Sequence, residues 1–179
     1  DLWVGPQAKR NYSPYYLPKK WRTFYDFGMG VLGDFGCHTF DMPVWALDLD
    51  PPTVVESIRR ESSLVGVIPA SSHIRYHFPA KGKRGPVKMD WFAGPQDWEK
   101  VGRIGAFGAE DATHAGRACW MVGDKGLMGC GTHAGAPMIL PNEVRRDWMT
   151  NPPEESIPRV EGGPFREWLR AIKGEGPEP

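Results

Sequence analysis

The sequence lacks the features that mark several classes of protein. Its 22 Lys and Arg balance its 22 Asp and Glu, so the formal net charge is zero, and no basic surface for nucleic acid is predicted. No apolar run approaches the ~20 residues needed to cross a bilayer, so no membrane partner is expected. No signal peptide is recognisable, and the sequence assigns no compartment. The chain begins without Met, and we interpret it as a fragment of a longer protein.

Cysteine is also scarce, with only Cys37, Cys119 and Cys130 among 179 residues. None of them has CxxC spacing, which argues against a disulfide framework or a zinc ribbon. Small buried thiols are the simpler expectation. The composition is otherwise that of a globular protein, with 40% hydrophobic and 12% aromatic residues, and residues 1–179 are enough for one domain with a core.

The most informative stretch runs from Gly28 to Leu47. It opens with three glycines in six residues, which suits a backbone that turns tightly or lets another group come close. Residues 33–48 are predicted to form a helix, with Asp34 as its N-cap. Pro43 inside this helix predicts a kink or a restart.

Helical periodicity gives this segment two different faces. The first face carries Asp34, His38, Asp41 and Trp45, and the second carries Cys37, Phe40, Val44 and Leu47. We expect the second, apolar face to be the buried one. An acid beside an imidazole is typical of acid–base chemistry, but it equally fits a helix cap next to a structural histidine.

The run Gly33-Asp-Phe-Gly-Cys-His-Thr-Phe-Asp41 follows Trp21-Arg22 and the opening Asp1-Leu-Trp-Val-Gly-Pro6. Together they resemble the glucose–fructose oxidoreductase / inositol dehydrogenase (Gfo/Idh/MocA) family, most strongly over residues 1–60. In that family an N-terminal Rossmann domain binds a nicotinamide cofactor, and a C-terminal α+β domain supplies substrate contacts and the assembly surface. The chain resembles the second domain. The resemblance therefore implies NAD or NADP held mainly by another domain, with no cofactor-binding residue in this chain.

The resemblance also implies roles for individual residues. His38 would relay a proton or hydrogen-bond the substrate, and Asp34 would orient and polarise it. Asp41, Trp21 and Arg22 would contact a sugar or polyol. The protein would form a homo-oligomer through its sheet face.

Two other functions stay open at this stage. Some relatives cleave glycosides as hydrolases or lyases through transient oxidation by the cofactor. Alternatively, the domain is a non-catalytic module for carbohydrate binding or oligomerisation.

The rest of the chain predicts an α+β fold, a mainly antiparallel open sheet with helices on one face. Residues 1–32 are expected to form an ordered loop rich in aromatic residues, 53–140 the sheet, and 141–173 a helical end. Residues 94–116 are expected to be a long loop. The last helix should turn an apolar face inward, made of Phe165, Trp168, Leu169 and Ile172.

A histidine pair stands out on the second predicted strand. On residues 71–79, His73, Arg75 and His77 share one face, because side chains alternate along a strand. Two histidines invite a metal site, but no carboxylate or cysteine at a matching spacing accompanies them. We therefore predict no metal.

Overall fold

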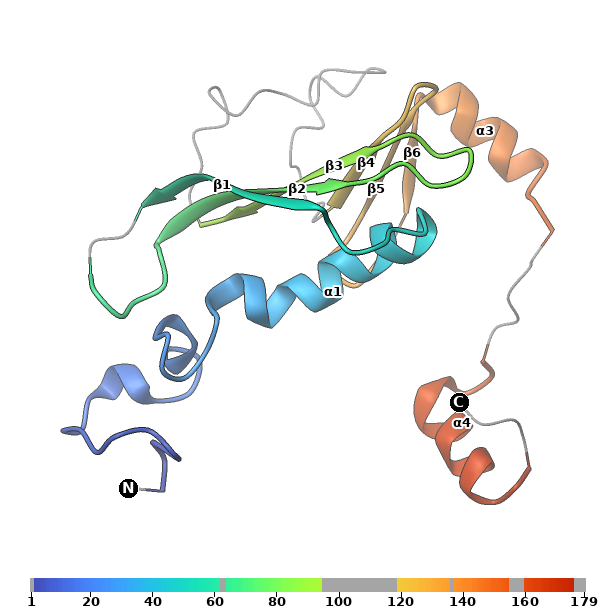
Figure 1. Ribbon diagram of the computed structural model, residues 1–179. Coiled ribbons are helices and arrows are strands. Elements are labelled where there is room, and N and C mark those ends of the chain that lie inside the picture. The colour runs from blue at the N-terminus through green and yellow to red at the C-terminus, as the bar shows by residue number, and fades with distance from the viewer. Residues whose placement is uncertain (1, 62–63, 95–118, 136, 155–159, 176–179) are drawn as a thin grey trace. The chain divides into compact units, whose positions relative to one another are not determined.

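The computed structural model describes residues 2–61, 64–94, 119–135, 137–154 and 160–175 (Figure 1). The chain forms two compact units, Asp1–Arg145 and Arg146–Pro179. Within the first unit lie the 3-10 turns η1 (Pro14–Tyr16) and η2 (Trp21–Thr23) and the helix α1 (Gly30–Ala46). Six strands follow: β1 (Val54–Glu61), β2 (Ser71–Phe78), β3 (Val87–Ala93), β4 (Cys119–Val122), β5 (Leu127–Cys130) and β6 (Met138–Leu140). The helix α3 (Asn142–Thr150) contains the division between the units, and α4 (Gly163–Ile172) lies in the second.

The described strands form two antiparallel sheets, in the orders β1-β2-β3 and β4-β5-β6. The predicted α+β class is therefore confirmed. The single sheet expected over 53–140 is instead divided into two among the described residues. The predicted long loop at 94–116 lies almost entirely outside them.

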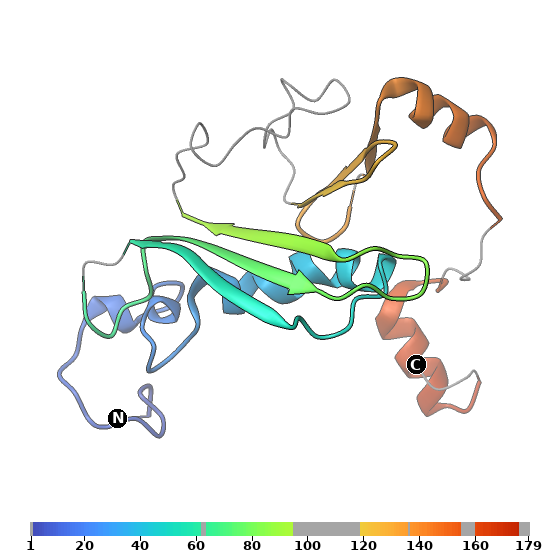
Figure 2. The same ribbon diagram turned by 45° about the horizontal axis from the view of Figure 1, so that its top comes forward.

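One part of the core of the first unit lies between the first sheet and α1, and its most buried apolar side chains, Leu127 and Cys130, lie on β5 of the second sheet. The register pairs Ile74 with Trp91 and Tyr76 with Met89, so these apolar side chains share one face of the sheet. Phe40 of α1 meets this face, with ring centroids 5.4 Å from Tyr76 and 5.3 Å from Trp91, both edge to face. Figures 1 and 2 show α1 running along this side of the sheet. The helix thereby covers the apolar face and leaves its own opposite face exposed.

Helix α1 begins earlier than the sequence predicted. Its N-cap is Met29, and Asp34 lies inside the helix, so the prediction of Asp34 as N-cap is wrong. Gly30 has a φ of +63°, a left-handed conformation that glycine adopts at no steric cost, and this lets the chain enter the helix before Asp34. Pro43 is accommodated without a restart, since the helix continues to Ala46.

The buried face of α1 is also rotated relative to the prediction. Gly36, Thr39 and Pro43 are buried, whereas Cys37 is exposed. The placement of Cys37 on the buried face is therefore wrong, although Phe40 packs as expected. The rotation keeps Asp34, His38 and Asp41 on the outer side of the helix.

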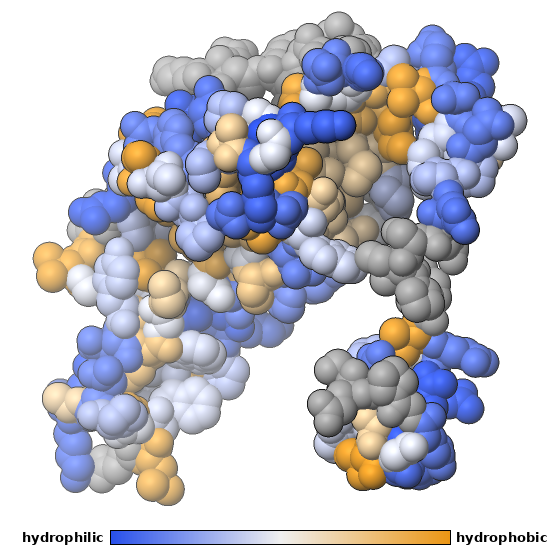
Figure 3. Space-filling model, turned by 45° about the vertical axis from the view of Figure 1, so that its right-hand side comes forward, coloured by the Kyte–Doolittle hydropathy of each residue, from blue (hydrophilic) through white to orange (hydrophobic). Residues whose placement is uncertain are grey.

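The second unit contains an amphipathic helix whose apolar side chains are exposed. In α4, Phe165, Trp168, Leu169 and Ile172 are 82%, 56%, 49% and 63% exposed, so the second unit does not bury this face by itself. Figure 3 shows hydrophobic residues reaching the surface of this helix. None of the helices in the described parts of the chain combines the length and apolar character needed to cross a membrane.

Candidate functional site

The centre of the candidate site is an ion pair between Arg22 and Asp34. Arg22 Nη1 donates to Asp34 Oδ2 at 2.5 Å, with 30% and 34% of the two side chains exposed. The pair joins η2 to the second turn of α1, and Gly28 makes this approach possible. A Cβ at Gly28 would lie 2.7 Å from Arg22 Cα and 2.9 Å from its carbonyl oxygen. One of the opening glycines therefore serves close backbone approach, as the sequence predicted.

Trp21 completes this group. The guanidinium of Arg22 lies 5.8 Å from the centroid of the Trp21 ring, a distance typical of a cation–π contact. Arg22 Nε is buried and has no hydrogen-bond partner among the described residues. The structure therefore brings Trp21, Arg22 and Asp34 together, and it leaves one guanidinium donor unused beside them.

His38 lies one helical turn after Asp34 and is exposed. Its ring centroid is 6.2 Å from that of Phe35 and 4.7 Å from that of His133, with the two imidazole planes inclined at 45°. His133 comes from the loop that follows β5. The site therefore contains two imidazoles in contact, of which sequence reasoning found only the first.

The loop that carries His133 is a tight turn. Gly131 N donates to Gly135 O at 2.9 Å, and Ala134 N donates to Gly131 O at 3.0 Å. Ala134 has a φ of 58°, which is uncommon for a residue with a side chain. The Gly-Thr-His-Ala-Gly sequence predicts a turn. It does not predict the contact with His38, because only the packing of the sheets brings His133 to α1.

Asp41 is on the outer side of α1 and is exposed. The structure gives it no hydrogen bond or ion pair with another described residue. Asp41 is thus available to solvent or ligand but is not joined to the Arg22–Asp34 pair. The assembled site consists of a neutralised ion pair next to two exposed imidazoles. These groups can donate hydrogen bonds to alcohols and accept hydrogen bonds from them.

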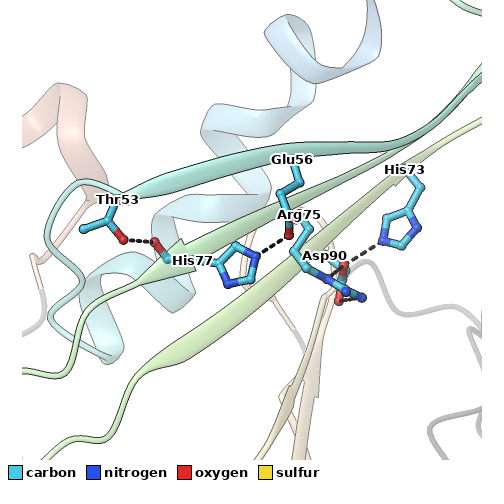
Figure 4. A network of polar contacts seen from close by, with 6 residues as sticks. All are labelled: Thr53, Glu56, His73, Arg75, His77 and Asp90. Atoms are coloured by element: carbon cyan, nitrogen blue, oxygen red, sulfur yellow. Dashed lines mark hydrogen bonds and ion pairs between the residues drawn. The ribbon is translucent and has the colours of Figure 1, made fainter.

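A second polar cluster lies on the face of the first sheet opposite α1 (Figure 4). Asp90 Oδ1 lies 2.6 Å from His73 Nε2 and 2.8 Å from Arg75 Nε, and Arg75 Nη2 reaches Asp90 Oδ2 at 3.3 Å. Beside it, His77 Nε2 lies 2.5 Å from Glu56 Oε2. The predicted polar face of His73, Arg75 and His77 is confirmed.

Each of the two strand histidines therefore has a carboxylate partner. Sequence spacing could not reveal these partners, since Asp90 and Glu56 lie on the neighbouring strands β3 and β1. Burial raises the pKa of Asp90, but the hydrogen bonds from Arg75 and His73 outweigh it and hold that pKa below its ordinary value. The hydrogen bond between Arg75 and Asp90 also raises the pKa of Arg75. The cluster is an ion-paired network that joins the strands of the sheet, and the described residues contain no group of three or more His, Cys, Asp or Glu suited to a metal ion.

Two of the three cysteines face each other across the second sheet. Cys119 of β4 is the register partner of Cys130 of β5, and Cys130 is 2% exposed. Burial, reinforced by the Cys130 thiol, raises the pKa of Cys119 to about 12. The prediction of small buried thiols thus fits Cys130 and the partly buried Cys119, but not the exposed Cys37.

No protein-family model matches this chain, and no curated protein gives a significant match to it. The family resemblance read from the sequence therefore stays a prediction.

Proposed function

We propose that the chain is the substrate-binding domain of an NAD(P)-dependent oxidoreductase that acts on a secondary alcohol of a sugar or polyol. The observation that best supports this function is the arrangement on the outer side of α1. Asp34 and His38 are one helical turn apart and face away from the core, with Arg22 bound to the first and His133 in contact with the second. A helix cap and a core histidine, the structural alternative for this pair, would not be placed in this way.

In the proposed reaction the alcohol loses a hydride from carbon and a proton from oxygen. His38 accepts the proton, because a neutral imidazole nitrogen can act as a general base. Asp34, fixed by Arg22, accepts a hydrogen bond from a substrate hydroxyl and orients the ring. Asp41 and Trp21 provide further contacts to the same substrate.

The bound nicotinamide would supply the hydride acceptor. The described residues do not fit a dinucleotide site of their own, because the glycine run before α1 follows a 3-10 turn instead of a strand. We therefore assign the cofactor, NAD or NADP, to a separate domain, as the resemblance implies, and this chain to substrate binding and proton transfer.

The decisive experiment replaces His38 in the parent enzyme that contains this chain. His38→Ala should lower turnover about 10²–10⁴-fold, the loss expected for a positioned acid–base group, as measured by NAD or NADP reduction with a panel of sugars and polyols. Its melting temperature should change little because His38 is exposed.

Phe40→Ala is the matched control on the same helix. It removes the ring that contacts Tyr76 and Trp91, so it should cost about 2–4 kcal/mol of stability and leave the turnover of the folded fraction intact. Cys37 was expected on the buried face, but because it is exposed, Cys37→Ala should have little effect on stability. An early melting transition with full turnover in His38→Ala would contradict the assignment.

We also propose that the domain self-associates through its first sheet. Strand β1 is at the edge of that sheet, and Val54, Val55 and Ile58 on it are 49%, 57% and 46% exposed. Exposed apolar side chains on a sheet edge favour pairing with another chain. Light scattering should give a dimer or larger species, and a monomer of 20.0 kDa at high concentration would count against this.

A further inference from the structure

A cavity of about 390 Å³ opens beside the N-terminal segment of the first unit. Its walls include the aromatic side chains of Trp3, Trp21 and Phe27 and the polar residues Gln7 and Asp26. The volume falls within the range of small-molecule sites, and such sites typically combine aromatic walls with a few polar groups. None of the roles assigned above uses this cavity, except for the contact expected of Trp21.

The walls of the cavity are held in place by specific contacts. The Trp3 indole Nε1 donates to the carbonyl oxygen of Tyr16. Asp26 Oδ2 accepts from Arg10 Nη2 at 2.6 Å, and the Arg10 guanidinium lies 4.9 Å from the centroid of the Phe27 ring. The indole and the carboxylate are therefore positioned before any ligand arrives, which lowers the entropy cost of binding.

We propose that this cavity binds a neutral saccharide ring. Sugar rings present C–H faces that pack on indoles, while their hydroxyls need donors and acceptors such as the Gln7 amide and the Asp26 carboxylate. A nucleotide would need a cation for its phosphates. The cations Arg10 and Arg22 beside the cavity walls are already paired with Asp26 and Asp34, so the charge balance favours an uncharged ligand.

The cavity adjoins the candidate site through Trp21. Trp21 lines the cavity, and the adjacent Arg22 binds Asp34 while its guanidinium lies 5.8 Å from the Trp21 ring. On this ground the proposal extends to a ligand with two linked rings, one in the cavity and the other beside Asp34. This extension rests on the proposed function, and it makes the substrate a glycoside of at least two rings instead of a free polyol.

The test uses NMR spectra of the ¹⁵N-labelled full chain, titrated separately with cellobiose, maltose and myo-inositol at millimolar concentration. The indole N–H signals of Trp3 and Trp21, assigned with Phe substitutions, should shift with a disaccharide. Trp3→Ala should weaken disaccharide binding by about tenfold or more, as expected for an aromatic anchor. Gln7→Ala changes an exposed side chain and should weaken disaccharide binding less than Trp3→Ala. It tests the cavity even if Trp3→Ala has a fold defect.

Trp168→Ala is the matched control. Trp168 is 56% exposed, against 58% for Trp3, but lies in α4 of the other unit, so its loss should leave binding unchanged. Equal weakening by Trp3→Ala and Trp168→Ala would overturn the proposal.

The remaining outcomes separate this inference from the proposed function. Disaccharide shifts of the His38 ring signals with Trp3 and Trp21 unchanged would overturn the cavity and leave the proposed function standing. Shifts of both indoles without any at His38 would support the cavity and count against the proposed function. Absence of shifts with all three compounds would overturn the saccharide site.

Discussion

Asp90→Asn tests whether the polar cluster on the first sheet stabilises the fold. In the native protein the carboxylate lies 2.6 Å from His73 Nε2 and accepts two hydrogen bonds from Arg75, at 2.8 and 3.3 Å. Asparagine has almost the same shape, but it carries no charge and replaces one acceptor oxygen with a donor group. Arg75 thereby loses its bidentate partner and His73 loses a charged one.

The magnitude follows from the geometry and from burial. A hydrogen bond to a charged group contributes about 1.5–3 kcal/mol, and breaking a fully buried ion pair costs about 3–5 kcal/mol. The side chains of Asp90 and Arg75 are 26% and 29% exposed, so water partly replaces what is lost. We expect Asp90→Asn to lower the free energy of unfolding by about 2–3 kcal/mol at pH 7 and the melting temperature by about 5–10 °C. Urea and thermal unfolding measure both quantities.

The pH dependence gives a second check. The pKa of Asp90 is lowered in the folded protein, so its carboxylate contributes stability that is fully present above the unfolded pKa of about 3.9 and is lost as the pH falls through the folded pKa. The difference in stability between wild type and Asp90→Asn should therefore stay constant from about pH 7 to 5 and shrink only below about pH 4. A difference that vanishes between pH 7 and 5 would refute this reasoning, because Asp90, whose pKa is lowered, stays ionised over that range.

Glu56→Gln is the control for burial. His77 and Glu56 are as close as His73 and Asp90, at 2.5 Å, but their side chains are 40% and 46% exposed. Exposed ion pairs contribute about 0.2–1 kcal/mol, so this variant should lose less than about 1 kcal/mol. If it loses as much as Asp90→Asn, burial and bidentate bonding do not explain the effect.

The other predictions concern the start of α1 and the cysteines. Gly28→Ala should lower the free energy of unfolding by about 1–3 kcal/mol, because the added methyl group overlaps the Arg22 backbone. Gly85→Ala is the control and should melt like wild type, because no atom lies within 4 Å of its Cβ. Equal effects of the two changes would contradict the packing argument. A thiol reagent at pH 8 should modify Cys37 first, because Cys37 is exposed and burial raises the pKa of Cys119 to about 12. Mass spectrometry after digestion gives the order, and earlier labelling of Cys119 would show that its strand opens readily.

Local patterns in the sequence predicted most of the elements. Alternation of apolar and polar residues located β2, and helical periodicity located most of α1. These predictions succeed because side-chain periodicity acts over a few residues. The same reasoning placed Asp34, His38 and Asp41 on one side of a helix.

Other features could not be derived from local patterns. The start of α1 depends on the left-handed Gly30, and the buried face of the helix depends on where Phe40 meets Tyr76 and Trp91. The second of these is decided by packing against strands that come later in the chain. Because the buried face of α1 is rotated, Cys37 is exposed and does not pack in the core as expected.

The candidate site also has some features that the sequence determines and others that depend on the tertiary structure. The sequence by itself determined that Asp34 and His38 share a helix face, because 3.6 residues per turn fix their relation. Only the tertiary structure decided that Arg22 binds Asp34, that His133 meets His38 and that Asp90 joins His73 to Arg75. These partners lie on other elements, and the free energy that brings them together comes mainly from burying apolar surface elsewhere, which no spacing of polar residues encodes.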